Sequence, residues 1–467
     1  MNSKPTSRRS RSKGSRSIIS AWGIAITLFV MLCMALGGSS SGGLLANILL
    51  ELGGALFLGY GVSRLGITAL SRSSKILLAI GACWAGWGLV QLVPLPPSLW
   101  TLVPGRDVLI HRLELAGVAL PWMPLSLNPE GTIRHLASLL PPFAVGILIL
   151  TRPPEDSRGL RWAIPLVALA SFLIGVLQLL GNVGSPLYFY QTTNLGMAVG
   201  LMANANHQAT LMLCAIPFVA SLAESGADRS KHARGLDLLL IAVAAMLAIG
   251  IAISNSYAAF ILAVPVIVAS WLVARPRSLG PARYVAVGMA VVGVAAVALV
   301  LIAGPDVLDT NTVGGPGQLS RPAMYSVTAT AMLHFFPLGS GFGSFVPVFK
   351  LFENPARVID VFANHSHSDY LELGLEGGLP ALLMMAVLLL WWCRQAITIW
   401  SARSPQRFNR AAVVSTAAIL LHSAVDYPAR TSTIAVVLAA GLALMATRVV
   451  KAAEEDEVAT GRHLRAE

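Results

Sequence analysis

The sequence predicts an all-α membrane protein with about twelve transmembrane helices and a large, partly helical loop between the ninth and the tenth. Of the 467 residues, 55% are hydrophobic and only 12% are charged, about half the charge of a typical soluble domain. Apolar runs of about 20 residues, the length that a bilayer-spanning helix needs, recur along the chain. These runs stay apolar instead of alternating with polar residues, which excludes a transmembrane β-barrel.

Twelve apolar runs, separated by charged or Pro/Gly-containing segments, are the expected spans. Cys33, Cys83, Cys214 and Cys393 all fall within them, so neither a disulfide framework nor a CxxC metal site is expected. The runs cover residues 17–38, 44–63, 76–96, 137–151, 162–180, 207–223, 236–253, 258–274, 285–303, 372–393, 411–427 and 432–447.

Basic residues divide unevenly between the two sides of these spans. With both termini in the cytoplasm, 26 of the 33 Lys and Arg residues fall on the cytoplasmic side and 7 on the outer side. Such asymmetry is the positive-inside pattern of multi-span proteins. The net charge of +11 is therefore explained by membrane topology, and no nucleic-acid partner is expected.

The expected organisation follows from these spans. Residues 1–16 form a basic cytoplasmic tail, residues 17–303 hold the first nine spans with an outer loop at 97–136, residues 304–371 form the large outer loop, residues 372–447 hold the last three spans, and residues 448–467 form a second cytoplasmic tail. Loops as long as the two outer ones usually have a function or no structure.

Within the large loop, a short amphipathic helix is expected after Ser320, a suitable N-cap, and before Pro337. Arg321 lies in its first turn, where free backbone N–H groups and the helix dipole favour an anion. An arginine fork at that place could bind a phosphate or pyrophosphate. Alternatively, Arg321 pairs with Asp306, Asp309 or lipid headgroups.

The segment that leads into the tenth span concentrates ionisable residues at the mouth of an apolar helix, where such groups are costly unless they are used. It contains His365, His367, Asp369, Tyr370, Glu372 and Glu376. Ser366 or Asp369 could cap the helix. If Ser366 is the cap, His367 lies in the first turn, where the dipole keeps its ring neutral. Zinc binding is not expected, because residues two apart share no helix face and no third ligand is suitably spaced. The alternative for either histidine is a solvated loop residue.

Other polar residues lie at the same ends of their spans. Asn204, Asn206, His207 and Gln208 precede the sixth span, while His422 and Asp426, four residues apart, end the eleventh, with Arg430 just beyond. All of them open toward the side of the large loop, which predicts a single extracytoplasmic site. Helix capping could explain each of them separately.

Several of these motifs together resemble the signature of bacterial O-antigen ligase and O-antigen polymerase proteins. They are Arg321, Pro337-Leu338-Gly339, His367-Ser368-x-Tyr370-Leu371-x4-Glu376-x-Gly378, and the stretch from His422 to Pro428. The resemblance is strongest over about residues 200 to 430.

The resemblance implies an inverting glycosyl transfer, without metal or cofactor, at the periplasmic face of the bacterial inner membrane. The donor would be a glycan on undecaprenyl pyrophosphate, the acceptor a glycan or the lipid A core, and a chain-length regulator protein a further partner. His367 and Arg321 match the family's functional histidine and loop arginine. The expected substrate-binding residues are His365, Asp369, Tyr370, Glu376, Asn206, His422, Asp426 and Arg430.

One segment departs from the family pattern. Where many relatives show a Ser-Arg pair near the eighth span, this chain has Ser254-Asn255-Ser256-Tyr257. Either another cation, such as Arg430 or Lys350, takes over phosphate binding, or that binding is weaker.

The acceptor and one rival class of function stay open. The first outer loop, with Pro94 to Pro97, looks like that of polymerases, which favours a polymerase of O-antigen or exopolysaccharide over a ligase or a protein O-glycosylation enzyme. The rival is a transporter of lipid-linked sugars or small solutes. Transporters need charged or broken helices at mid-membrane, and here Glu51 is the main intramembrane charge.

Overall fold

The computed structural model describes residues 20–41, 45–223, 231–274, 321–355, 363–402 and 406–447. Within these ranges every regular element is a helix, and an isolated bridge pairs Leu95 with Met123. The all-α class is therefore confirmed.

The helices of the first half are α1 (Ala21–Leu36), α2 (Leu45–Ser63), η1 (Ile67–Ala69), α3 (Arg72–Val90), α4 (Pro97–Trp100), α5 (Asp107–Leu115), α6 (Pro129–Ser138), α7 (Leu140–Thr151), η2 (Pro154–Ser157) and α8 (Leu160–Leu180). The second half contains α9 (Ala205–Ser221), α10 (Lys231–Ile253), α11 (Tyr257–Ala274), α14 (Arg321–His334), α15 (Phe345–Phe352), α16 (Asp369–Ser401), α17 (Arg407–His422), η4 (Pro428–Arg430) and α18 (Ser432–Thr447).

Eleven of the twelve predicted apolar runs coincide with helices, and the ninth, 285–303, lies outside the described residues. Seven helical stretches of the described chain are long and apolar enough to cross a membrane. The chain is thus a multi-pass membrane protein, while the count of twelve spans stays a prediction. The seven stretches are Leu45–Ser63, Arg72–Val90, Pro129–Thr151, Pro154–Leu180, Gly235–Ile253, Tyr257–Ala274 and Asp369–Ser401.

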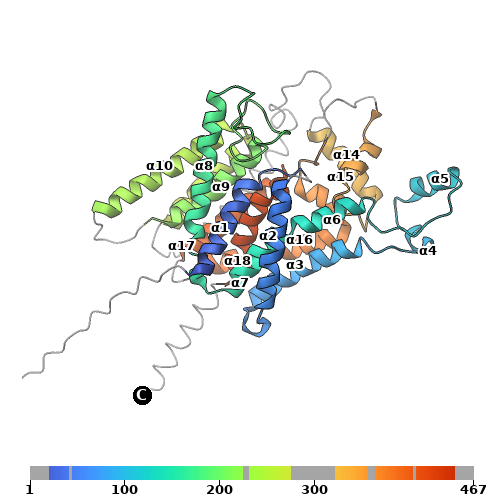
Figure 1. Cartoon of the computed structure of the whole chain (residues 1–467), viewed down its shortest axis with the longest axis horizontal. Helices are drawn as coiled ribbons and strands as arrows, with labels where there is room; N and C mark the ends of the chain where they lie inside the picture. The colour runs from blue at the N-terminus through green and yellow to red at the C-terminus, as the bar shows by residue number, and fades with distance from the viewer. Residues whose placement is uncertain are drawn as a thin grey trace, which may run out of the picture.

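Helix α9 lies at the centre of the bundle, packed between α8, α10, α11 and α17. Helix α18 is buried almost as completely, against α1, α7 and α17. In contrast, α10 lies at one edge of the molecule, and the short helices α4 and α5 project beyond the opposite edge (Figure 1). The peripheral helices α2 and α10 expose leucines such as Leu56 and Leu238, as helix faces in contact with lipid do.

Small residues allow the central helices to approach closely. A Cβ on Gly54 of α2 would lie 2.6 Å from the backbone nitrogen of Pro141 in α7, and one on Gly441 of α18 would lie 2.4 Å from Cγ2 of Thr416 in α17. Without a hydrophobic driving force between helices in lipid, close packing of this kind is a main source of association energy.

Helix α16 breaks at Gly378, whose φ of 61° and ψ of −158° are not helical. Pro380 follows, and the backbone N–H of Leu379 donates to the carbonyl of Pro337 instead of continuing the helix. The predicted tenth span, 372–393, thus lies in a helical stretch long and apolar enough to cross a membrane, but with a break where the Pro337–Gly339 segment meets it. The first two turns of α16 form a separate arm that contacts α14 and α15.

A stack of aromatic and cationic side chains joins α1, α2 and the end of α7. The rings of Trp22 and Tyr60 stack with centroids 4.1 Å apart. The guanidinium of Arg152 lies 5.3 Å from the Trp22 ring, and that of Arg64 lies 5.6 Å from the Tyr60 ring. Since the other end of α1 is bonded to Thr433 at the start of α18, this stack lies at the end of α1 that is remote from Arg430.

Candidate functional site

The polar residues singled out in the sequence gather where the first turns of α9, α14 and α16 meet the connection between α17 and α18. The backbone N–H of Asp369 donates to the carbonyls of Ser423 and Asp426, and the Asp369 carboxylate accepts from the Ser423 hydroxyl at 2.7 Å. These bonds fix the start of α16 to the α17–α18 connection. The predicted convergence of separate helix ends is therefore present.

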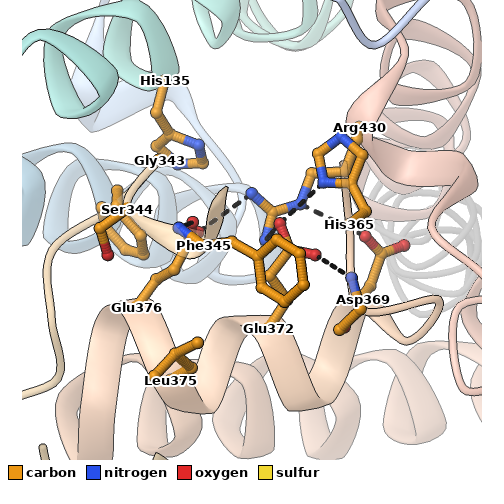
Figure 2. Close-up of polar contacts among 12 residues, drawn as sticks. His135, Gly343, Ser344, Phe345, His365, Asp369, Glu372, Leu375, Glu376 and Arg430 are labelled. Carbon is orange, nitrogen blue, oxygen red and sulfur yellow. Dashed lines mark hydrogen bonds and ion pairs between the residues drawn. The ribbon is translucent and has the colours of Figure 1, made fainter. Parts of the chain in front are cut away.

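Arg430 is surrounded by three carboxylates from the first two turns of α16. Its Nε lies 3.5 Å from Asp369, its Nη2 3.4 Å from Glu372 and its Nη1 3.1 Å from Glu376. Figure 2 shows these acidic side chains rising from one helix toward the guanidinium. Residues at positions i, i+3 and i+7 share one face of a helix, which is why a single cation can contact all three. We call these four residues the Arg430 cluster.

The cluster extends to His365 and to the backbone. Nδ1 of His365 lies 2.8 Å from one oxygen of Glu372, and the other oxygen accepts from the backbone N–H of Ser366 at 2.9 Å. Glu376 accepts from the backbone N–H of Phe345 at 3.0 Å, on the side of the cluster where Figure 2 places Gly343 and Ser344. The glutamates are 0–1% exposed, so their charges are stabilised by the protein rather than by solvent.

His367 stands beside the cluster and binds a different carboxylate. Its Nδ1 lies 3.2 Å from Oδ1 of Asp426, and its φ of 55° places it in the left-handed region, which is uncommon for residues other than glycine. Its backbone carbonyl accepts from the hydroxyl of Tyr325 at 2.9 Å. Tyr325 lies one turn after Arg321 in α14, so the segments around residues 321 and 367 are in contact.

The cap of α16 differs from expectation. Ser368 is the N-cap, and its side chain accepts from the backbone N–H of Leu371. His367 therefore precedes the helix, and neither Ser366 nor Asp369 caps it. The first-turn dipole argument for His367 therefore does not apply.

Electrostatics distinguish Asp426 from an ordinary buried acid. Burial alone would raise the pKa of its carboxyl, but the hydrogen bond from His367 and the nearby charges of His207 and Arg321 lower the pKa overall. Burial raises the pKa of Tyr325 to about 12, despite the opposing charge of Arg321. Tyr325 is thus a neutral hydrogen-bond donor, and Asp426 is an anion.

Tyr427 is packed between the histidines. Its ring centroid lies 4.4 Å from that of His365, 4.8 Å from that of His207 and 5.0 Å from that of His367. Its hydroxyl accepts from the side-chain amides of Asn204 and Asn364, each at 3.4 Å. Asn204 is also the N-cap of α9. Tyr427 therefore holds three elements of the site in one arrangement.

Tyr370, His422 and Asn206, which were also predicted as site residues, form hydrogen bonds within the protein. Tyr370 donates its hydroxyl to the carbonyl of Leu420 at 2.7 Å. His422 is fully buried against Thr210, and Asn206 is 8% exposed with its carbonyl accepting from the same threonine. His365 and His367, whose side chains are 15% and 22% exposed, are more accessible than these.

Three residues with central positions were not among the predicted site residues: Glu372, Tyr325 and Tyr427. Glu372 had a detectable signal, because Asp369, Glu372 and Glu376 share one helix face and such an acidic face at the mouth of a span requires a cation. The two tyrosines had none, since their partners are 42 and 63 residues away in the chain.

No group of three or more His, Cys, Asp or Glu side chains within the described ranges is arranged to hold a metal ion. An apolar cavity of about 470 Å³ adjoins the Arg430 cluster. It is lined by α2, α3, α7, α16 and α18, and its polar end is formed by His135, Asp369 and Arg430.

Comparison with protein families finds a match to part of the chain. The O-antigen ligase family matches residues 241–386, about a third of the chain. The match includes Arg321, His367 and Glu376, while Asp426 and Arg430 lie beyond it. No curated protein matches the chain. Residues 241–386 are therefore similar to the O-antigen ligase family, and this match supports the resemblance seen in the sequence motifs.

Proposed function

We propose that this protein transfers a glycan from undecaprenyl pyrophosphate to an acceptor hydroxyl at the periplasmic face of the inner membrane, with inversion. The observation that carries the proposal is the contact between His367 and Asp426 beside the helix that begins at Arg321. The family match supports glycosyl transfer in general; the donor, the acceptor and the membrane face are parts of the proposal.

His367 is proposed as the base. Because the ionised carboxylate of Asp426 can only accept, Nδ1 of His367 donates to it. The neutral ring therefore carries its proton on Nδ1 and its lone pair on Nε2. The left-handed backbone, the Tyr325 bond and the ring contact with Tyr427 fix the orientation of that lone pair.

The proposed reaction is a single displacement. The acceptor oxygen bonds to the anomeric carbon while the bond from that carbon to the pyrophosphate oxygen breaks, and the hydroxyl proton passes to Nε2 of His367. The lipid pyrophosphate leaves as an anion, neutralised by Arg321 and the positive end of the α14 dipole. Since pyrophosphate is already a good leaving group, charge stabilisation and positioning contribute most of the acceleration.

Arg430 is a poor candidate for the second phosphate-binding cation. All three of its guanidinium nitrogens face carboxylates, so its hydrogen-bond donors are already taken and a pyrophosphate would have to displace acidic side chains. We therefore propose that Arg430, Asp369 and Glu376 position the site rather than bind substrate. The phosphate role stays with Arg321 in this proposal.

The test uses the purified protein in lipid nanodiscs with a synthetic undecaprenyl-pyrophosphate glycan and an acceptor glycan. His367→Ala and Arg321→Glu should each reduce product formation on the order of a hundredfold or more. His334→Ala, at the end of α14 and ion-paired with Asp107, is the control and should retain activity. Normal product from both site variants would contradict the proposal.

The same assay separates the enzyme from the transporter. The break of α16 at Gly378 is a feature that transporter helices also show. Transfer of the glycan without any ion gradient supports the enzyme, whereas gradient-dependent movement of an unchanged lipid-linked sugar supports the transporter.

Among the acceptors we favour the polymerase, because the first outer loop looks like that of polymerases. Gel analysis of lipopolysaccharide from a deletion strain tests this choice. A single repeat on the core indicates a lost polymerase, and a core without O-antigen indicates a lost ligase. A chain-length regulator protein is proposed as partner of the polymerase.

A further inference from the structure

A second histidine, His422, lies one turn before Asp426 in the chain. It is fully buried at the end of α17, and its Nδ1 lies 2.7 Å from Oγ1 of Thr210 in α9. The Thr210 hydroxyl donates its hydrogen to the carbonyl of Asn206 at 2.9 Å. It must therefore accept from His422, whose neutral ring then has its proton on Nδ1 and a lone pair on Nε2.

Three buried atoms around Asp426 have no hydrogen-bond partner among the described residues. They are Nε2 of His422, Oδ2 of Asp426 and Nε2 of His207. Their side chains are at most 1% exposed, and buried polar groups in proteins are nearly always satisfied. Two of the three are acceptors, so a direct bond between His422 and Asp426 lacks a hydrogen. A molecule that donates two hydrogens would satisfy both.

Charged and titratable side chains from every neighbouring element surround Asp426, His422 and His207. The backbone N–H of Asp426 donates to the carbonyl of His422 at 3.0 Å, one turn earlier, and Asp426 interacts electrostatically with His207, His422 and Arg321. The full set is His207 from α9, Arg321 and Tyr325 from α14, His365 and His367 from the preceding segment, Asp369 from α16, and Tyr427 from the connection.

We propose that Asp426, His422 and His207 enclose one water molecule, which donates to Oδ2 of Asp426 and to Nε2 of His422 and accepts from Nε2 of His207. Three polar partners are typical of a buried structural water. This inference rests on the proposed function: the water fixes the carboxylate that orients His367. His422 is then a positioning residue that acts through Asp426, and Thr210 selects its tautomer.

The first test measures protonation and needs no activity. Solid-state NMR of the protein in nanodiscs with ¹⁵N-labelled histidine should find His422 neutral between pH 6 and 8, with the proton on Nδ1. Thr210→Val, which removes the acceptor, should abolish that preference, and Thr210→Ser should keep it. A doubly protonated His422, or a proton on Nε2 in the wild type, would overturn the water bridge.

The second test is the pH profile of kcat. His422→Asn places an amide where Nδ1 donates to Thr210 but leaves nothing at the Nε2 position. Without the Nε2 acceptor that orients the bridging water, the hydrogen bond from that water to Asp426 weakens, and the carboxylate holds the proton of His367 more tightly. The acidic limb should move to higher pH, by about half a unit to one unit, with KM unchanged and kcat about tenfold lower.

His422→Gln extends an amide to the Nε2 position and should keep the profile closer to that of the wild type. His334→Asn, at the end of α14, is the matched control and should change neither kcat nor the limb. A lower kcat with an unmoved limb in His422→Asn would mean that His422 is merely structural, and the inference fails. If His367→Ala is fully active while the tautomer is as expected, the proposed function fails and the water site stands.

Discussion

At the scale of single residues, the charge balance of the Arg430 cluster has a clear consequence for stability. One guanidinium, 16% exposed, compensates three carboxylates: those of Glu372 and Glu376, 1% exposed, and that of Asp369, 12% exposed. Removing one partner of a buried ion pair costs about 3–5 kcal/mol, because the remaining charge is left uncompensated. Arg430→Met should therefore lower the free energy of unfolding by about that amount, as measured by thermal or denaturant unfolding in detergent micelles.

The matched control is Arg134→Met in α6. Arg134 pairs with Glu130 four residues earlier, but both side chains are more than 60% exposed. Exposed pairs of this kind contribute about 0–1 kcal/mol. If Arg430→Met is as well tolerated as Arg134→Met, the cluster does not hold α16 to the α17–α18 connection.

The lowered pKa of Asp426 predicts a specific pH dependence. A carboxyl whose pKa is lower in the folded state than in the unfolded chain stabilises the fold fully above its unfolded value, about 3.8. That contribution is lost as the pH falls toward the folded pKa. The difference in unfolding free energy between wild type and Asp426→Asn should be constant from pH 5 to 8 and shrink below about pH 4.

A difference that does not shrink as the pH falls from about 4 to about 2 would contradict the lowered pKa of Asp426. Comparing two variants that differ only at this carboxyl cancels the titration of the other acids. The measurement is equilibrium unfolding at a series of pH values.

The sequence motifs include most residues that the structure brings together here, but they do not predict how these residues pair. His365 and His367 are only two apart, yet one binds Glu372 and the other Asp426, because the left-handed conformation at His367 turns the two rings toward different elements. No periodicity predicts such a conformation in a residue other than glycine. Arg430, one of the cations expected to take over phosphate binding, contacts three carboxylates of α16 instead.

At the scale of elements, the arm formed by the first two turns of α16 depends on its break. Gly378 has a φ of 61°, and a Cβ at this position would lie 2.2 Å from the carbonyl oxygen of Pro337. Gly378→Ala must therefore displace backbone as well as strain φ. We expect it to reduce both thermal stability and glycosyl transfer strongly, measured on the purified protein.

Gly59→Ala in α2 is its control. A Cβ on Gly59 meets nothing within 4 Å, and alanine is favoured over glycine in a helix by up to about 1 kcal/mol. This variant should be neutral or slightly more stable. Equal losses in both variants would mean that the break at Gly378 is not required.

Individual helices could be predicted where one face is apolar along the whole length of the helix. The run over 321–335 has apolar residues at helical spacing, and α14 forms there with Met324, Thr328 and Ala331 buried. The break in α16 was missed because Gly377-Gly378 and Pro380 are all tolerated in transmembrane helices. What interrupts the helix is the backbone of Pro337, about 40 residues earlier, and no local pattern reports such a contact.

At the scale of the whole molecule, the proposed topology places α14 outside the cell membrane and the η2 region in the cytoplasm. Ser326 of α14 and Arg158 after η2 are both exposed. In a chain whose native cysteines are replaced, Ser326→Cys should react in intact spheroplasts with a membrane-impermeant maleimide. Arg158→Cys should react only after the membrane is permeabilised.

The reverse labelling pattern would place the site in the cytoplasm and end the proposal of a periplasmic reaction. All four native cysteines lie in helices and are expected to face other helices or lipid. The chain without them is therefore expected to show little labelling, and any signal comes from the introduced cysteine. Insertion of each variant is verified by its expression level in the membrane fraction.

The helical, multi-span architecture was predictable because a hydrocarbon layer leaves few alternatives to apolar helices. The arrangement of those helices was not predictable, because a leucine-rich helix face is equally suited to contact lipid or another helix. The central helix, α9, has Asn206, His207 and Gln208 in its first turn. This polar start does not by itself predict that α9 lies at the centre of the bundle, because a helix at the edge could begin in the same way.

The stack of Arg64, Tyr60, Trp22 and Arg152 also bears on the height of the site above the lipid. Aromatic and basic side chains prefer the zone between headgroups and hydrocarbon, so this stack resists vertical movement of α1, α2 and α7. Helices hardly stretch along their axes, and α1 is bonded to α18 at its far end. An anchor at one leaflet thus sets the level of the histidines at the other, and a thicker or thinner bilayer would change their distance from a phosphate held at the surface.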